Sequence, residues 1–188
     1  MKKFIAILLA ATLALSLAAC TTGSKDPVPS TVPTSPSTAP TTTSYSGSLV
    51  ELIQAIYDKQ PVDLMLSEPT TIDVADPDAL SYYLGLKDGS KLSEAMYSEA
   101  MITSQAYSLC AARVADAKDA GEVAQQILDQ VNPNKWICVT ADNVQIGVSG
   151  NLILLVMVSD SLSETLADDL MAAFTEVVGG SLDTTLKK

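Results

Sequence analysis

The chain has 188 residues, of which 22 are Asp or Glu, 11 are Lys or Arg and none is His, giving a formal net charge of −11 at pH 7. This acidic excess excludes proteins that bind nucleic acid through a basic surface, and it disfavours adhesion to anionic lipid. The absence of histidine removes the commonest general base and the commonest zinc ligand.

Residues 1–19 have the organisation of a secretory signal peptide. Lys2 and Lys3 precede an apolar run over residues 4–19, which is too short for a comfortable membrane span. The sequence LAAC at residues 17–20 resembles the lipobox of bacterial lipoproteins, in which the cysteine receives a diacylglycerol and becomes the N-terminus after cleavage. The resemblance implies a bacterial protein that is exported and held on the outer side of the cell membrane by lipid on Cys20.

A tether is predicted for residues 20–47, between the lipidated Cys20 and the folded part of the chain. In residues 21–47, 19 of the 27 residues are Ser, Thr or Pro, so there is too little apolar surface to offset the entropy of ordering. Five prolines favour extended polyproline II, at about 3.1 Å per residue. Such a segment is either an inert spacer or an O-glycosylated stalk.

Residues 48–188 are predicted to form one domain that begins with a helix. Apolar residues recur at helical spacing over residues 48–57. Residues 76–85 predict a second, short helix, because Asp76 can cap it, Pro77 fits its first turn and Gly85 supplies a left-handed exit. Two strands are expected next, over residues 91–97 and 104–114.

After the first two helices, the predicted order is β-β-α followed by β-β-α. Asp119 is expected to cap a helix that continues to residue 131. Strands are predicted over residues 144–149 and 152–158, joined by a turn; the second is apolar on both faces and should be central. A capping box at 161–164 is expected to open the last helix, which runs toward residue 178.

The predicted fold class is therefore α+β. We expect an antiparallel sheet of about four strands in β-β-α-β-β-α order, preceded by an N-terminal helix. The two helices that follow the strand pairs are expected on one face of the sheet, and the N-terminal helix is a candidate cover for the other face.

The domain also resembles a family of small bacterial lipoproteins that carry a domain of unknown function. The resemblance lies in DPDALSYYLG at residues 76–85, QAYSL at 105–109 and NPNKWICV at 132–139, and it extends over most of residues 48–188. It implies a location in the cell envelope and brings neither an activity nor functional residues.

Two cysteines remain after lipidation, and an exported domain can pair them. Cys110 and Cys138 form either a disulfide or two free thiols, with Cys110 then packed as a small buried side chain. Their spacing matches no metal or redox motif. The acidic run IDVADPD at residues 72–78 lacks the order of a calcium-binding loop, so no metal site and no cofactor are predicted.

Aromatic side chains are the best candidates for contact with a partner. Tyr82 should lie outside the buried face of its helix, and Trp136 follows a helix end. No nucleophile motif is present, so no catalytic residue is assigned.

We therefore expect a lipid-anchored, extracytoplasmic binding or accessory module. It would contact the membrane through Cys20 and an envelope protein or glycan through its domain. The alternative hypothesis is an enzyme that uses carboxylates to act on a cell-envelope substrate.

Overall fold

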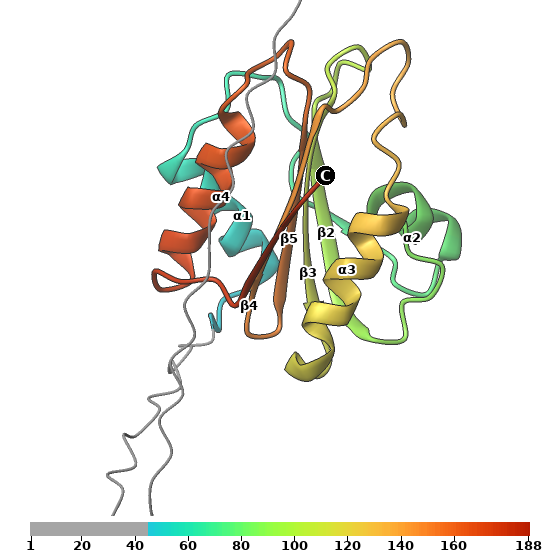
Figure 1. Cartoon of the computed structure of the whole chain (residues 1–188), viewed down its shortest axis with the longest axis vertical. Coiled ribbons are helices and arrows are strands. Elements are labelled where there is room, and N and C mark those ends of the chain that lie inside the picture. The colour runs from blue at the N-terminus through green and yellow to red at the C-terminus, as the bar shows by residue number, and fades with distance from the viewer. Residues whose placement is uncertain (1–44) are drawn as a thin grey trace, which may run out of the picture. The chain divides into compact units, whose positions relative to one another are not determined.

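The computed structural model describes residues 45–188, so the predictions for residues 1–44, including lipidation of Cys20, lie outside the described residues. Within 45–188 the chain forms four α-helices and six strands of one sheet (Figure 1). The elements in chain order are α1 (Leu49–Lys59), β1 (Thr70–Ile72), α2 (Pro77–Leu84), β2 (Leu92–Glu99), β3 (Tyr107–Val114), the 3-10 turn η1 (Ala117–Asp119), α3 (Ala120–Gln130), β4 (Asn143–Ser149), β5 (Leu152–Val158), α4 (Leu166–Val177) and β6 (Thr184–Lys187).

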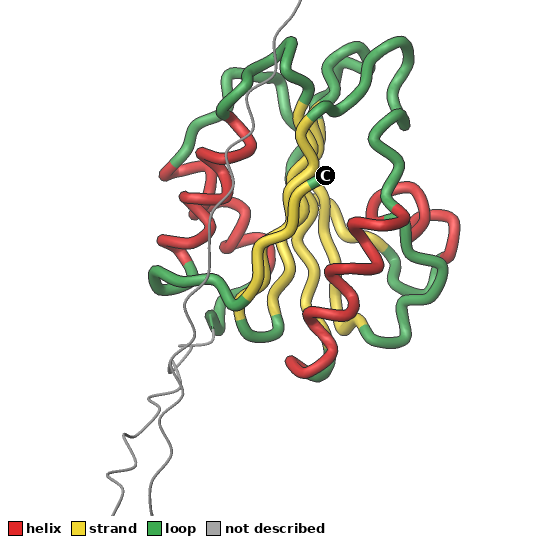
Figure 2. Tube along the Cα trace, in the orientation of Figure 1, coloured by secondary structure: helices red, strands yellow, loops and turns green. Residues whose placement is uncertain are grey.

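The sheet has the strand order β1-β2-β3-β5-β4-β6, and each neighbouring pair is antiparallel. Figure 2 shows the strands as a layer with helices on either side. Every residue of β5 is buried, and β5 lies between β3 and β4. The prediction of a central strand at residues 152–158 is confirmed, as is the hairpin that joins it to β4.

Helices cover both faces of the sheet (Figure 1). One apolar cluster packs α1 and α4 against the sheet, and the other packs α2 and α3 against the opposite face. The alternation of side chains along each strand explains this, because successive residues of β3 and β5 enter different clusters. Burial from both sides also explains why β4 is buried along its length although its sequence alternates.

The first two helices begin as their sequences predict. In α1, the Ser48 hydroxyl accepts from the Glu51 backbone N–H, and the Glu51 carboxylate accepts from the Ser48 backbone N–H, forming a capping box. In α2, Asp76 accepts from two backbone N–H groups, Pro77 occupies the first turn, and Gly85 ends the helix with φ 72°.

Two details of the predicted sheet are wrong. The sheet has six strands because β1 and β6, of three and four residues, add an edge strand on each side. These segments are too short to show an alternating pattern. The prediction that α3 and α4 cover the same face of the sheet is also wrong. They lie on opposite faces, and α4 shares its face with α1.

Two predicted caps are also replaced by neighbours. The Asp119 side chain makes no capping bond, and Asp116 instead accepts from Lys118 N at the start of η1, which leads into α3. Residues 161–164 form no capping box. The Ser163 hydroxyl accepts from Thr165 N and Leu166 N, so α4 begins later than its sequence predicts.

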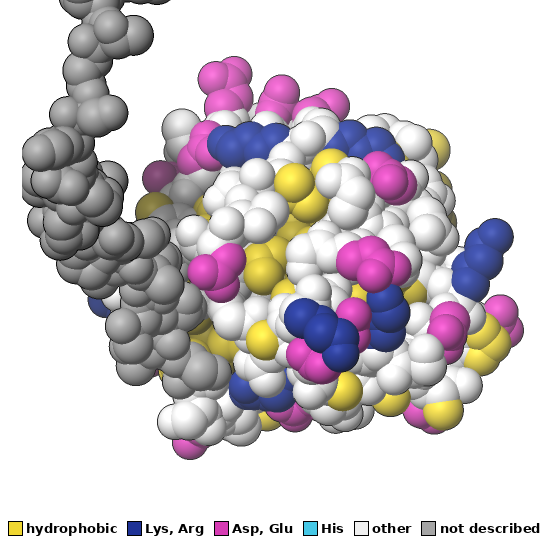
Figure 3. Space-filling model, turned by 60° about the horizontal axis from the view of Figure 1, so that its bottom comes forward, with side chains coloured by type: hydrophobic (Ala, Val, Ile, Leu, Met, Phe, Trp, Pro, Cys, Tyr) yellow, Lys and Arg dark blue, Asp and Glu magenta, His cyan; other side chains and the backbone are white. Residues whose placement is uncertain are grey.

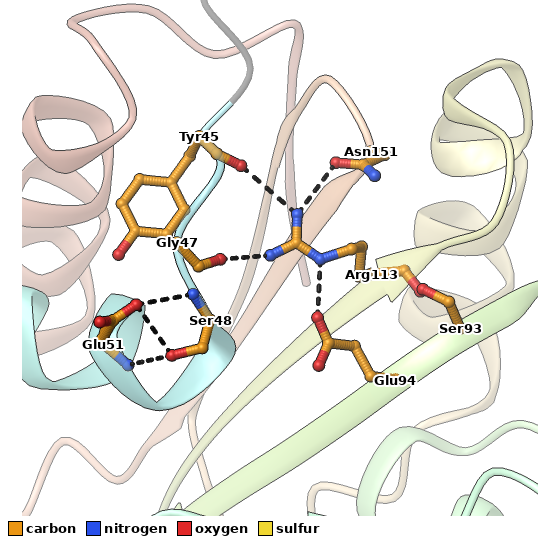
Figure 4. Close-up of polar contacts among 8 residues, drawn as sticks. All are labelled: Tyr45, Gly47, Ser48, Glu51, Ser93, Glu94, Arg113 and Asn151. Carbon is orange, nitrogen blue, oxygen red and sulfur yellow. Dashed lines mark hydrogen bonds and ion pairs between the residues drawn. The ribbon is translucent and has the colours of Figure 1, made fainter.

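Arg113, the only arginine of the chain, fixes the segment that leads into α1 (Figure 4). Its guanidinium donates to the carbonyl oxygens of Tyr45 at 3.4 Å and Gly47 at 2.7 Å. It also donates to Glu94 of β2 at 2.7 Å and to Asn151 of the β4–β5 turn at 3.4 Å. One side chain therefore joins two strands, a hairpin and the entry of the chain into the domain.

The sheet thus has two different ends. The entry end contains Arg113, the β4–β5 turn and the segment at 45–48. The loop end contains four connections, at residues 60–69, 100–106, 131–142 and 159–165, which lie at the top of Figure 1. Because β3 has eight residues, the two ends lie about 25 Å apart.

Candidate binding surface around Lys135

The two aromatic residues predicted to contact a partner lie together beside Lys135. The Lys135 Nζ atom lies 4.8 Å from the ring centre of Tyr82 and 5.1 Å from that of Trp136. A third ring, that of Tyr83, lies 5.2 Å from the same atom. Tyr82 and Tyr83 come from α2, whereas Lys135 and Trp136 come from the α3–β4 loop, so the surface joins two segments that are far apart in the sequence.

Helix geometry separates the two adjacent tyrosines. Neighbouring positions point about 100° apart around a helix, so Tyr83 turns to the sheet and stacks on Tyr97 with ring centres 3.9 Å apart. Tyr82 packs edge-on against Tyr83 at 4.8 Å and remains 46 % exposed. The prediction that Tyr82 faces solvent is confirmed, and Trp136 is half-buried.

Lys135 is a buried cation with a partner of opposite charge. Its Nζ atom donates to a Glu99 carboxylate oxygen at 2.5 Å and to the Ser108 hydroxyl at 3.3 Å. The Lys135 side chain is only 2 % exposed. Breaking such a pair by removing one partner costs about 3–5 kcal/mol, because the other charge is left buried. The pair therefore holds the α3–β4 loop on the end of β2.

Hydrogen bonds within the α3–β4 loop bring Lys135 to this position. The Asn132 side chain accepts from Asn134 N at 2.9 Å, and Ala141 N donates to the Pro133 carbonyl at 2.9 Å. Thr140 Oγ1 adds a bond to the Asn134 side chain at 2.7 Å. These contacts turn the chain back on itself, so that Lys135 points to the sheet.

We call Lys135, Glu99, Tyr82, Tyr83 and Trp136 the Lys135 cluster. Three rings around an ammonium resemble an aromatic cage for a cationic ligand, but here the protein's own lysine occupies that position. Because the amine is buried and paired, it is not available to a substrate as a nucleophile. The cluster is thus a fixed platform whose exposed part is Tyr82 and the edge of Trp136.

Two groups at this platform, the Tyr83 hydroxyl and the Cys110 thiol, are held in their neutral forms. Burial raises the pKa of Tyr83, and the nearby Tyr97 hydroxyl and Glu99 carboxylate raise it further. Burial also raises the pKa of the Cys110 thiol to about 11, although Lys135 acts in the opposite direction. A protonated, buried thiol is inert as a nucleophile.

A hollow of about 310 Å³ adjoins Tyr82 on the outer side of the cluster. Its lining residues are Asp78, Ser81, Tyr82, Gln130, Asn132 and Lys135. The hollow therefore combines an aromatic ring with carboxylate, hydroxyl and amide groups. Such a combination can hold a polar ligand or a partner's side chain, with the ring for contact and the polar groups for orientation.

The structure contains both cysteines as free thiols. Cys110 is buried on β3, where its S–H donates to the Tyr83 carbonyl at 3.6 Å. Cys138 is exposed on the α3–β4 loop with φ 62°. Of the two alternatives that the sequence leaves open, the structure has the unpaired one.

The search for metal ligands gives no site in the described part of the chain. No group of three or more His, Cys, Asp or Glu side chains is placed to hold a metal ion within residues 45–188. In the acidic run, Asp73 accepts from Ala75 N and Asp76 accepts from Asp78 N. These two carboxylates serve the local turn and the α2 cap.

Sequence reasoning missed Lys135 and Glu99, which organise the site. A lysine beside a tryptophan in a loop gives only a weak signal. The contact with Glu99 spans 36 positions and depends on the path of the α3–β4 loop. Glu99 itself is one of 22 acidic residues and stands out only in three dimensions.

Comparisons with known proteins leave the function to be inferred from the chain's own residues. No family model, no curated protein and no solved structure matches it. Within residues 45–188, none of the helices has the length and apolar character needed to cross a bilayer.

Proposed function

We propose that the chain is an exported lipoprotein, anchored to the bacterial cell membrane through Cys20, whose domain is a non-catalytic binding or accessory module of the cell envelope. The observation that supports this function most strongly is the platform at the Lys135 cluster. It places Tyr82 and Trp136 beside one another and a polar hollow next to Tyr82. The ligand or partner would be an envelope glycan or protein.

The arrangement of carboxylates favours this function over a carboxylate-dependent enzyme. A hollow on α4 contains two carboxylates, Asp169 and Glu176. They are seven residues apart on one helix, so about 10 Å separates them along its axis. Asp169 accepts from the Thr165 hydroxyl, and Glu176 is paired with Lys59 at 2.8 Å. Neither is set against the other for acid and base catalysis.

Partner capture from intact cells tests the proposal. The tagged chain is crosslinked in cells and purified from membranes, beside a Cys20→Ala variant and a Tyr82→Ala variant. We expect membrane attachment to be lost in Cys20→Ala. We expect one envelope component to be enriched with the unaltered chain and reduced with Tyr82→Ala, because that ring is the exposed part of the platform. Equal recovery with all three chains contradicts the proposal.

A further inference from the structure

Three exposed apolar side chains gather at the loop end, on the α1–β1 and β2–β3 connections. Met65, Met101 and Ile102 are 64 %, 63 % and 48 % exposed. The bridge between Leu66 and Ala100 is antiparallel, and Met101 N donates to the Met65 carbonyl at 2.8 Å. Residues 65 and 101 are therefore opposite one another and point to the same side, away from the partly buried Leu66 and Ala100.

We call Met65, Met101 and Ile102 the apolar tip. Nothing in the packing of the domain requires these side chains, since both apolar clusters form without them. Methionine is flexible and polarisable, and it is common on surfaces that adapt to a partner. A further exposed apolar residue, Ile137, lies on the neighbouring α3–β4 loop, next to Trp136 of the Lys135 cluster.

The loop end, which carries the apolar tip, is acidic. The four connections of the loop end carry five exposed carboxylates, on Asp63, Glu68, Asp142, Asp160 and Glu164. Their one basic residue is Lys135, which is buried and paired with Glu99. Lys187 of β6 lies at the opposite edge of the sheet from β1, where it pairs with Asp168 at 2.5 Å, and the Lys188 ammonium donates to the Leu128 carbonyl at 3.1 Å.

The entry end has a different charge pattern. Figure 3 shows lysine or arginine side chains next to carboxylates on that side of the molecule. Lys91 pairs with Glu122 at 2.6 Å and Lys118 with Asp116 at 2.5 Å. The exposed side chains of the tip thus lie on connections whose exposed charged residues are all acidic.

From this pattern we propose that the apolar tip docks a protein partner whose contact surface is apolar and flanked by Lys or Arg. Charge complementarity selects such a partner, because an anionic membrane and a second copy of this chain would both meet like charge at the tip. The position is also suitable, since Arg113 holds Gly47 at the other end of the sheet. This inference deepens the proposed function by stating the partner's chemistry.

Synthetic peptides of defined chemistry test the inference. The full chain is placed in phosphatidylcholine nanodiscs, with empty nanodiscs as the blank. One fluorescent peptide is an amphipathic helix with Leu on one face and Lys on the other, and its counterpart has Glu in place of Lys. We expect the Lys peptide to bind at least about tenfold more tightly than the Glu peptide, with an affinity that falls as salt rises.

Substitutions at the tip complete the test. The double variant with Met101→Ser and Ile102→Ser should bind the Lys peptide about tenfold more weakly than the unaltered chain does. Val50→Ser, an exposed apolar position on α1, should leave binding unchanged. Equal affinity for the two peptides, or no effect of the tip substitutions, overturns the inference. If capture from cells finds a partner that these peptides do not displace, the tip proposal fails while the binding module stands.

The fluorescence of Trp136, the only tryptophan in the chain, distinguishes a lipid surface from a protein partner as the occupant of the tip. In nanodiscs of brominated phosphatidylcholine, we expect its emission to stay unquenched, because the loop end points to a protein rather than to the bilayer. Strong quenching that is lost with Met101→Ser and Ile102→Ser would make the bilayer the occupant and would overturn the proposal.

Discussion

The two ends of the sheet use buried cations in different ways. At the entry end, Arg113 divides its donors among two backbone carbonyls, a carboxylate and an amide. At the loop end, Lys135 directs its single ammonium to Glu99 and is surrounded by three rings. The planar guanidinium can join several segments at once, whereas the lysine is a point charge that needs one close partner.

This difference gives the two ends different surfaces. The entry end has ion pairs on its surface and holds Gly47 through Arg113. The loop end buries its one basic residue and leaves carboxylates and apolar side chains exposed. Under the proposed function, the surface at the loop end would face a partner, and the entry end would follow the lipid anchor.

The largest loss of stability is expected from Lys135→Met. The substitution leaves the Glu99 carboxylate buried without a counter-charge, so the free energy of unfolding should fall by about 3–5 kcal/mol. Chemical denaturation followed by circular dichroism measures this change. Adding Glu99→Gln to Lys135→Met should restore most of the loss, because the buried charge is removed. A single variant as stable as the unaltered chain would show that the ion pair does not hold the loop.

A smaller loss is expected from Gly85→Ala, which tests how α2 meets the end of α3. Gly85 has φ +72°, and an added Cβ would lie 2.4 Å from the Val131 backbone nitrogen. Strain and overlap together should lower stability by about 2–3 kcal/mol.

The matched control for this glycine is Gly121→Ala. An added Cβ at Gly121 meets nothing within 4 Å, and the residue lies within α3. This substitution should raise stability by about 0.5–1 kcal/mol, since alanine favours a helix more than glycine does. A thermal denaturation series on both variants checks the opposite signs, and equal shifts would contradict the close packing of α2 on α3.

Arg113→Lys should weaken the entry end alone. Lysine keeps the charge but lacks the planar guanidinium, whose separate N–H groups donate to Gly47 and Glu94. The free energy of unfolding should therefore fall by about 1–2 kcal/mol. Hydrogen exchange should also become faster in the first turn of α1. Lys118→Ala, which removes an exposed pair, should change neither quantity. Faster exchange at the α3–β4 loop instead would contradict the separate roles of the two ends.

The smallest expected effect is a difference in reactivity between the Cys110 and Cys138 thiols, measured in a Cys20→Ala chain. Cys138 is exposed, so iodoacetamide should modify it in the folded protein near pH 8. Cys110 is buried with a pKa of about 11, so its native reaction should be negligible near pH 8 and should rise as the pH approaches 11. Mass spectrometry should find one modified cysteine before unfolding and two afterwards. Equal rates for both thiols would mean that β3 opens readily.

Much of the local structure could be predicted from the sequence, because its signals lie within a few residues. The Asp76 and Gly85 signals of α2 and the doubly apolar β5 are examples, and the structure confirms them. The face on which α3 and α4 lie depends on long-range packing, and edge strands of three or four residues show no periodicity. These features were therefore predicted wrongly or missed.

The site was predictable in part for the same reason. Solvent exposure of Tyr82 follows from its place on a short helix, and the structure confirms it. The meeting of Tyr82 with Trp136 could not be predicted, because it depends on Lys135 and Glu99, whose contact brings a loop to a strand end 36 positions away. The charge contrast between the ends likewise appears only when four separate connections are placed together.

The most direct test of the binding module is photo-crosslinking from two single positions in intact cells. A photoreactive aromatic amino acid replaces Tyr82 at the Lys135 cluster in one chain and the exposed Lys118 at the entry end in the other. We predict a discrete crosslinked product from position 82 and none from position 118. Identical products from both positions, or a product from position 118 alone, would contradict a recognition surface at the loop end.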